Sequence, residues 1–283
     1  MKYKTLQLAA ENGIGVIWMN RADVRNAFNE TMIGELTQAF QSADEDESIR
    51  AVVLAGHGPA FCAGADLNWM KKMSGYSLKQ NLADALELAA MLNTIYMMKK
   101  PTVARVHGPA FAGGMGLVAA CDIALAAQEA EFCLSEVKLG LTAATISPYV
   151  VAAMGERQAR RYFLSAERFT AAEAFRIGLV HDLATTQQLD ASVNALLAHL
   201  LAASPAAIAA SKELIRAVAR APIDQKMIAD TATRIAAARA SADGKEGIRA
   251  FLEKRKPAWA IKPASSAKTK ATQNKKTTLR PGD

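Results

Sequence analysis

Short apolar runs alternate with longer segments of helical periodicity along the first half of the chain. The runs predict four strands, at residues 14–19, 51–55, 102–106 and 123–126. Apolar residues that recur every three or four positions predict helices at 29–42 and 78–97, and a short helix from Gly114. The 78–97 helix is expected to bury five apolar residues: Leu82, Leu86, Leu88, Leu92 and Ile95. Strands that alternate with helices indicate an α/β fold with a largely parallel sheet.

Helical patterns dominate the second half. Thr170 and Glu173 have the spacing of a capping box, and Gly178 suits the end of the helix that they begin. A last short strand is expected at 179–183. Further helices are expected near 187–203, 206–219, 225–240 and 247–256. We therefore divide the chain into a core of residues 1–203, a C-terminal helical region of 204–261 and a tail of 262–283.

The distribution of charge argues against nucleic acid as a partner. The chain has 283 residues, 51% of them hydrophobic, which is enough for one large core. Its net charge is +7, but residues 262–283 alone hold six basic residues against one acidic residue. The rest of the chain is therefore nearly neutral. The basic tail is rich in Lys, Thr, Ser and Ala, which predicts disorder.

Several absences restrict the class of protein. No apolar run reaches the roughly 20 residues that span a bilayer, and residues 1–7 lack the apolar stretch of a signal peptide. The cysteines and histidines are scattered and show no metal-ligand spacing. We expect a cytoplasmic protein with no membrane partner and no metal site.

Two glycine-bearing turns and one carboxylate carry the candidate chemistry. The turns at 61–67 and 108–116 each follow a predicted strand, where main-chain N–H groups can lie bare. Glu136 follows a third strand-like run. Two N–H donors that face one thioester oxygen, beside a carboxylate, form a site for enolate chemistry.

These motifs and their order resemble the crotonase, or enoyl-CoA hydratase/isomerase, superfamily. The resemblance covers roughly residues 10–260 and is carried by Ala63-Gly64-Ala65-Asp66-Leu67, His107-Gly108 with Gly113-Gly114, Cys121-Asp122-Ile123-Ala124, Glu136-Val137-Lys138-Leu139-Gly140, Ala171-Ala172-Glu173-Ala174 with Gly178-Leu179-Val180, and Phe251-Leu252-Glu253-Lys254-Arg255-Lys256. The resemblance implies a spiral of ββα units and a C-terminal helical region for oligomerisation. It also implies assembly as a homotrimer or a dimer of trimers.

The resemblance assigns catalytic roles to three positions. The N–H groups of Ala65 and Gly113 match the oxyanion hole, and Glu136 matches the catalytic glutamate that acts as general base. Coenzyme A is then part of the substrate, and no separate cofactor is implied.

The resemblance also implies the CoA contacts. Arg25 matches a basic residue near the nucleotide phosphates, and Lys254 of a neighbouring subunit is placed to reach them. The adenine and pantetheine end is expected along Ala63, Asp66 and Leu67.

The sequence departs from the family pattern at Gly116, where the best-known hydratases carry a second glutamate. Family members with one glutamate include hydratases and Δ3,Δ2-enoyl-CoA isomerases, so both reactions stay open. A non-catalytic or RNA-binding relative that works through the basic tail is a further alternative. Ala144 replaces the aspartate of dienoyl-CoA isomerases and aryl-CoA dehalogenases, which argues against both.

Three segments, 132–138, 146–151 and 155–162, resemble bacterial hydratases of methylglutaconyl-CoA and related branched glutaconyl-CoA thioesters. The acyl pocket is expected to be lined by Trp69, Met70, Met73, Met91 and Tyr149. A distal carboxylate needs a cation, for which the candidates are Lys71 and Lys72.

Overall fold

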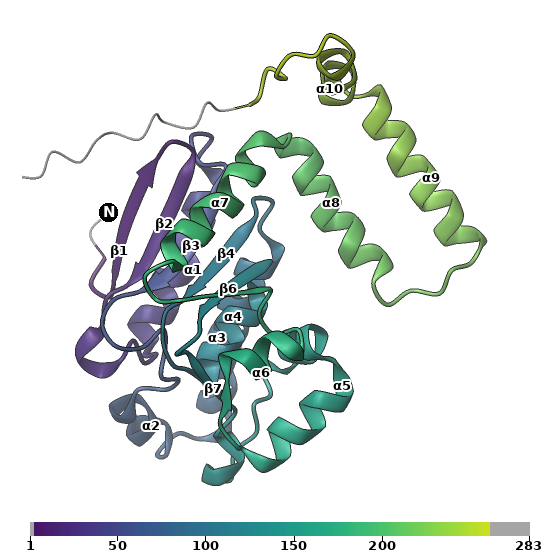
Figure 1. The fold of residues 1–283 in the computed structure, drawn as a ribbon. Helices are drawn as coiled ribbons and strands as arrows, with labels where there is room; N and C mark the ends of the chain where they lie inside the picture. Colours follow the sequence, from purple (N-terminus) through teal and green to yellow (C-terminus); the bar gives the residue numbers. More distant parts are fainter. Residues whose placement is uncertain (1–2, 261–283) are drawn as a thin grey trace, which may run out of the picture.

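The computed structural model describes residues 3–260, which fold into a sheet-centred body and a helical arm (Figure 1). The main sheet has six strands in the order β1-β2-β3-β4-β6-β9. Its strands are β1 (Leu6–Glu11), β2 (Ile14–Met19), β3 (Ala51–Gly56), β4 (Thr102–Val106), β6 (Ile123–Ala127) and β9 (Asp182–Ala184). Strand β1 pairs antiparallel with β2, and every other pair in this sheet is parallel. The predicted largely parallel sheet is confirmed.

Helices cover both faces of the main sheet. Helices α1 (Glu30–Glu45) and α3 (Leu78–Met97) contact each other on one face, and α7 (Leu189–Ala202) packs on the other. Strand β3 shows why both faces need cover, because all six of its residues are buried. Asn29 caps α1 by accepting a hydrogen bond from the N–H of Met32 at 2.9 Å.

A second sheet of three short strands is set beside the first. It has the order β5-β7-β8, with β5 at Ala110–Phe111, β7 at Glu131–Cys133 and β8 at Phe169–Thr170. The central strand β7 pairs parallel with β5 and antiparallel with β8. Six further helices complete the described body: η1 (Ala22–Val24), α2 (Leu67–Met73), α4 (Gly113–Ala120), η2 (Glu136–Leu139), α5 (Ser147–Ser165) and α6 (Ala171–Arg176). Helix α5 bends at Gly155.

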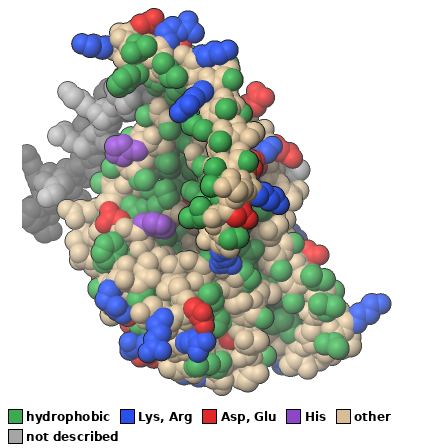
Figure 2. All heavy atoms as spheres, turned by 90° about the vertical axis from the view of Figure 1, so that its right-hand side faces the viewer, with side chains coloured by type: hydrophobic (Ala, Val, Ile, Leu, Met, Phe, Trp, Pro, Cys, Tyr) green, Lys and Arg blue, Asp and Glu red, His purple; other side chains and the backbone are tan. Residues whose placement is uncertain are grey.

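The C-terminal arm consists of α8 (Pro205–Val218), α9 (Gln225–Ala240) and α10 (Ala242–Leu252), which extend away from the body in Figure 1. Helix α9 buries no residue, and α8 buries Lys212. The ammonium of Lys212 contacts Oδ2 of Asp122 at 2.6 Å and donates to the C=O of Lys100 at 2.9 Å. Seven large apolar residues of the arm stay exposed: Ile215, Ile223, Ile228, Ile235, Ile248, Phe251 and Leu252. Figure 2 shows hydrophobic side chains along the arm and around a hollow beside it.

The end of the described chain returns to the body. The guanidinium of Arg50 donates to the C=O of Trp259 at 3.0 Å and to that of Ala203 at 2.7 Å. The hydroxyl of Ser204 donates to Asp243 at 2.5 Å, which joins the start of α8 to α10. The predicted tail of residues 262–283 lies outside the described residues.

Several sequence expectations need correction. Leu82 and Leu86 are each 58% exposed and Leu88 is half-buried, because the buried residues of α3, Met91, Leu92 and Ile95, all lie in its second half. The last strand of the main sheet begins at Asp182 rather than 179. Strand β1 and helices α2 and α5 were not anticipated from the pattern. Edge strand β1 buries one residue in six, so it carries no apolar run.

Candidate active site

The first glycine turn leaves the N–H of Ala65 without a main-chain partner. Phe28 donates its N–H to the C=O of Gly64 at 2.7 Å and accepts from the N–H of Asp66 at 2.8 Å. In such a parallel bridge the central residue, Ala65, turns its own N–H away from its neighbour. Among residues 3–260, no hydrogen bond occupies this N–H. The turn therefore presents one free donor.

The second turn presents its donor at the start of α4. Gly113 is the first residue of that helix, where N–H groups have no intrahelical acceptor. Ala112 before it has φ 48° and ψ −120°, a conformation that a residue with a Cβ adopts only under constraint. The constraint includes a hydrogen bond from the N–H of Ala112 to the C=O of Cys133 at 2.8 Å. The positive end of the α4 dipole adds to the site.

The two turns lie side by side. Cys62 and Ala110 form a parallel bridge, and the N–H of Phe111 donates to the C=O of Cys62 at 2.9 Å. A Cβ on Gly114 would lie 2.4 Å from that same carbonyl oxygen, so the close approach requires glycine here. Both free N–H groups therefore belong to adjacent loops.

Glu136 follows strand β7, which is hydrogen-bonded to the strand that leads into the second turn. The register pairs Phe111 with Cys133, so the chain passes from β7 to Glu136 directly beside the Gly113 loop. The side chain is half-buried, and its Oε2 is buried without a hydrogen-bond partner among the described residues. Burial raises the pKa of the Glu136 carboxyl above its usual value. A carboxylate with one buried oxygen free of a partner among the described residues, next to the loop that carries one of the two donors, fits the general base expected from the sequence.

Four of the five residues expected to contact CoA lie in or near the first turn, and their side chains differ in how exposed they are. The C=O of Arg25 accepts from the N–H of Ala63 at 3.0 Å, while the Arg25 side chain is exposed. Leu67 is 80% exposed at the start of α2. The fifth, Lys254, follows α10 in the sequence and is exposed.

The carboxylate of Asp66 is engaged within the fold. Asp66 caps α2 by accepting from the N–H groups of Asn68 and Trp69, and it pairs with Arg21 at 2.9 Å. Burial acts to raise the pKa of Asp66, but the Arg21 guanidinium and the helix N–H groups lower it below its usual value. A CoA contact at this position would fall to the main chain.

The expected acyl-pocket residues divide into core and surface. Met91 is fully buried in α3, and Trp69 donates its Nε1–H to Asp84 at 3.0 Å. Tyr149 is half-buried and lies edge-on to Tyr96, with ring centroids 5.4 Å apart. Both candidate cations, Lys71 and Lys72, are exposed, but Lys72 is paired with Glu30.

Two side chains that the sequence did not single out shape the site. A Cβ on Gly116 would lie 2.3 Å from Cγ2 of Ile146, so the buried Ile146 fills the place of any side chain at 116. A Cβ on Gly113 would lie 2.6 Å from the ring of Phe28. Both residues are apolar, and an isolated apolar residue in the sequence gives no signal that it will lie at a functional site.

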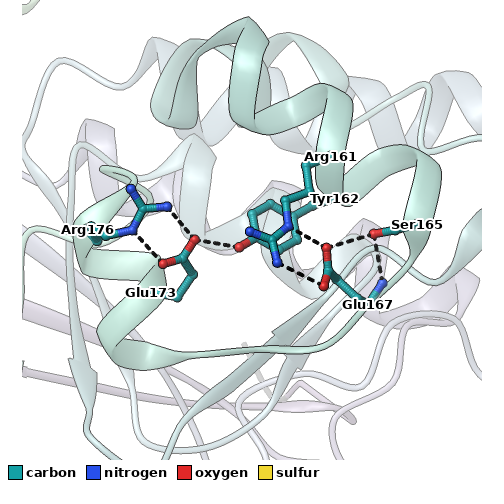
Figure 3. Close-up of polar contacts among 6 residues, drawn as sticks. All are labelled: Arg161, Tyr162, Ser165, Glu167, Glu173 and Arg176. Atoms are coloured by element: carbon teal, nitrogen blue, oxygen red, sulfur yellow. Dashed lines mark hydrogen bonds and ion pairs between the residues drawn. The ribbon is translucent and has the colours of Figure 1, made fainter.

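A network of polar contacts surrounds Tyr162 and Glu173 (Figure 3), and aromatic contacts connect it to β7, the strand that precedes Glu136. The hydroxyl of Tyr162 donates to Glu173 at 2.5 Å, and Glu173 also accepts from Arg176. The Tyr162 ring lies 4.2 Å from that of Phe169, which stacks on Phe132 of β7 at 5.7 Å. These contacts join α5 and α6 to β7, the strand that precedes Glu136.

Neither a metal centre nor a single membrane span is found in residues 3–260. No group of three or more His, Cys, Asp or Glu side chains there has the arrangement of a metal site. No single helix there is long and apolar enough to cross a bilayer; α7 and α8 pass that test only as a pair, bent by 103°.

The ββα spiral, with its paired turns and its helical arm, defines a crotonase-type fold. Comparison with known proteins supports this class. The model of the enoyl-CoA hydratase/isomerase family matches residues 9–262. The chain therefore belongs to the enoyl-CoA hydratase/isomerase family.

Individual relatives agree with the family match. The chain is 31% identical over 261 residues to a crotonyl-CoA hydratase from Syntrophomonas wolfei, covering 90% of this chain and 98% of that protein. A crystal structure of an enoyl-CoA hydratase from Shewanella pealeana is similar with a TM-score of 0.89 and 43% identity, covering 91% of this chain and 97% of that one. AtuE from Pseudomonas aeruginosa gives a TM-score of 0.87 at 36% identity, with 91% and 100% covered.

Proposed function

We propose that this enzyme adds water across the double bond of a 2-enoyl-CoA thioester, with a branched glutaconyl-CoA as the preferred substrate. The observation that carries the proposal is the buried, partner-free Oε2 of Glu136 beside the two turns whose N–H groups are free. The names of the Syntrophomonas and Shewanella relatives support the reaction.

The chemistry follows from these groups. Glu136 removes a proton from a water molecule, and the water oxygen bonds to the β-carbon as the double-bond electrons move to the thioester oxygen. The N–H groups of Ala65 and Gly113 hold that oxygen while it carries negative charge. The proton on Glu136 then returns to the α-carbon, the thioester carbonyl re-forms, and the product has gained one water.

A Δ3,Δ2-enoyl-CoA isomerase is the second candidate, and the surroundings of Gly116 favour keeping it. Ile146 and Leu92 occupy the space beside Gly116, so the site offers no second carboxylate there. One glutamate that removes a proton and returns it to another carbon would move a double bond without water. Product mass separates the two reactions.

Recognition of the CoA half and of the acyl end is part of the proposal. The exposed guanidinium of Arg25 is available for a phosphate, and the C=O of Ala63 for the adenine end, since its N–H already donates to Arg25. Lys71, exposed and next to the paired Lys72, is the candidate for a distal carboxylate. No cofactor beyond the CoA of the substrate is proposed.

The exposed apolar residues of the arm support assembly into a trimer, alone or as a dimer of trimers. The arm buries few of its residues against its own subunit and exposes an apolar surface, which in an oligomer neighbouring subunits cover. In a trimer, Lys254 of one subunit would approach the CoA phosphates of another. Sedimentation equilibrium on the full chain tests this assembly, and a monomer at micromolar concentration would contradict it.

The decisive experiment offers purified protein crotonyl-CoA and 3-methylglutaconyl-CoA in parallel. Loss of the conjugated enoyl-thioester absorbance gives the rate, and mass spectrometry identifies the product. A gain of one water with the branched diacid preferred supports the proposal. A product of unchanged mass indicates the isomerase, and no reaction with either substrate favours a non-catalytic relative.

A further inference from the structure

Phe28 contacts both loops that carry the proposed oxyanion donors. Its residue is 1% exposed and lies between η1 and α1. Its two main-chain hydrogen bonds, with Gly64 at 2.7 Å and Asp66 at 2.8 Å, flank Ala65 on both sides. The main chain of Phe28 therefore fixes the direction of the Ala65 N–H.

The ring of the same residue reaches the second loop. A Cβ built on Gly113 would lie 2.6 Å from Cε2 and 3.0 Å from Cδ2 of Phe28. The ring thus packs directly against the Cα of Gly113 and limits how closely that loop approaches the first. Because the contact leaves no room for even a methyl group, small changes in the ring must displace the loop.

The segment before Phe28 is itself fixed to the first loop. The fully buried side chain of Asn26 donates to the C=O groups of His57 at 2.8 Å and Ala60 at 2.9 Å. Arg21 pairs with Asp66 and donates to the C=O of Ala27. With its main chain held on one loop, Phe28 cannot shift its ring without disturbing the other.

We propose that Phe28 is a positioning residue that sets the spacing between the N–H donors of Ala65 and Gly113. The inference rests on the proposed function, because the spacing matters only if both donors bind one thioester oxygen. An oxyanion needs each donor about 2.7–3.1 Å away, so a displacement of less than an ångström weakens the transition state more than the bound substrate.

The test compares Phe28→Leu with Phe40→Leu. Phe40 is equally buried and belongs to the same hydrophobic cluster, but it lies within α1. Phe28→Leu should lower kcat about tenfold or more while KM changes by about twofold or less. Phe40→Leu should lose similar thermal stability and keep kcat within about twofold. Equal losses of kcat in both variants would overturn the proposal.

A binding probe separates this inference from the proposed function. An aryl-acryloyl-CoA absorbs further to the red when hydrogen bonds polarise its carbonyl, and no turnover is needed to see the shift. The native protein and Phe40→Leu should show the red shift, and Phe28→Leu should show a smaller one. No shift in the native protein would refute the oxyanion hole itself; an unchanged shift in Phe28→Leu would refute the role of Phe28 alone.

A double variant tests the contact between the Phe28 ring and Gly113 directly, and the test does not require every single variant to fold. Gly113→Ala keeps the N–H but adds the Cβ that meets the Phe28 ring, so its probe shift and kcat should fall. Phe28→Leu in the same chain makes room for that Cβ and should recover part of both. Should Phe28→Leu not fold alone, Phe28→Met replaces it in both experiments. Strictly multiplicative losses in the double variant would overturn the proposal, because independent residues show no coupling.

Discussion

At the scale of single residues, the site depends on one carboxylate whose surroundings are largely apolar. Burial raises the pKa of Glu136, and no described side chain pairs with its Oε2. At Gly116, where the best-known hydratases carry a second glutamate, the buried Ile146 fills the space beside the glycine and supplies no charge. In the proposed mechanism Glu136 alone accepts the proton and returns it, so both the rate and its pH dependence should report on that residue.

Glu136→Gln should lower kcat by at least about a hundredfold, because the amide cannot accept a proton from water. In the native enzyme the raised pKa means that the basic form is lost as pH falls, starting at a higher pH than for an ordinary glutamate. The acid side of a kcat/KM profile should show this. The control is Glu129→Gln, which changes an exposed glutamate on the turn after β6. Near-native turnover in Glu136→Gln would contradict the assignment of Glu136 as general base.

Gly116→Glu should not create a second catalytic carboxylate. The new side chain meets Ile146 at its first carbon, and overpacking with a buried charge should cost about 3 kcal/mol or more. Adding Ile146→Ala opens the space and should restore part of the stability. Urea unfolding of the single and double variants measures both, and a fully stable Gly116→Glu would show that Ile146 moves aside without cost.

At the scale of elements, the short strands β7 and β8 and the helices α5 and α6 support the segment that carries Glu136. Tyr162 of α5 and Glu173 of α6 are joined by one short hydrogen bond, and the Tyr162 ring continues through Phe169 to Phe132 of β7. The Arg176 and Tyr162 hydrogen bonds lower the pKa of Glu173 to about 2, while burial and Glu173 raise that of Tyr162 to about 12.

Tyr162→Phe should lower the free energy of unfolding by about 1.5–3 kcal/mol at pH 7, as loss of a hydrogen bond to a charged group does. Because the folded pKa of Glu173 is lowered, the stabilisation is present above pH about 4.5 and disappears as pH falls toward about 2. Urea titrations of both proteins between pH 7 and 2 should show the gap narrowing at the acid end, because the hydrogen bond from Arg176 keeps the pKa of Glu173 lowered in the variant as well. A gap that stays constant over this range would mean that Glu173 is not its source.

At the scale of the whole molecule, a nearly neutral catalytic body carries a projecting arm and is followed by a basic sequence. The buried Lys212 ties α8 to Asp122, and Arg50 ties the end of the described chain to the body. The arm and the body are therefore braced together by a few polar contacts, with most apolar residues of the arm left exposed.

Deleting residues 262–283 should leave turnover and oligomeric state unchanged, because the active-site residues and the arm precede them. The deletion removes a net charge of five from a chain of +7. Steady-state kinetics and light scattering test the expectation. Loss of a salt-sensitive RNA affinity on deletion, with no enzyme activity in either form, would support the RNA-binding alternative instead.

Local signals in the sequence determined the element types, the α/β class, the two turns and the family resemblance. Apolar periodicity and glycine placement act over a few residues, so 14–19, 51–56 and 102–106 were predicted within a residue. Strands of two or three residues, such as β5 and β8, carry too little pattern to recognise. The prediction that Leu82 and Leu86 are buried was wrong because periodicity identifies the apolar face of a helix but not whether another segment covers that face.

Only the tertiary structure decided which apolar residues bear on the site. The sequence assigned no role to the Phe28 and Ile146 side chains. In the structure they pack against Gly113 and Gly116, which lie 85 and 30 residues away along the chain, respectively. The free N–H groups, the engagement of Asp66 with Arg21 and the raised pKa of Glu136 likewise depend on burial and on distant partners. A sequence specifies periodicity and local turn chemistry, whereas close approach between remote segments is settled only when the whole core packs.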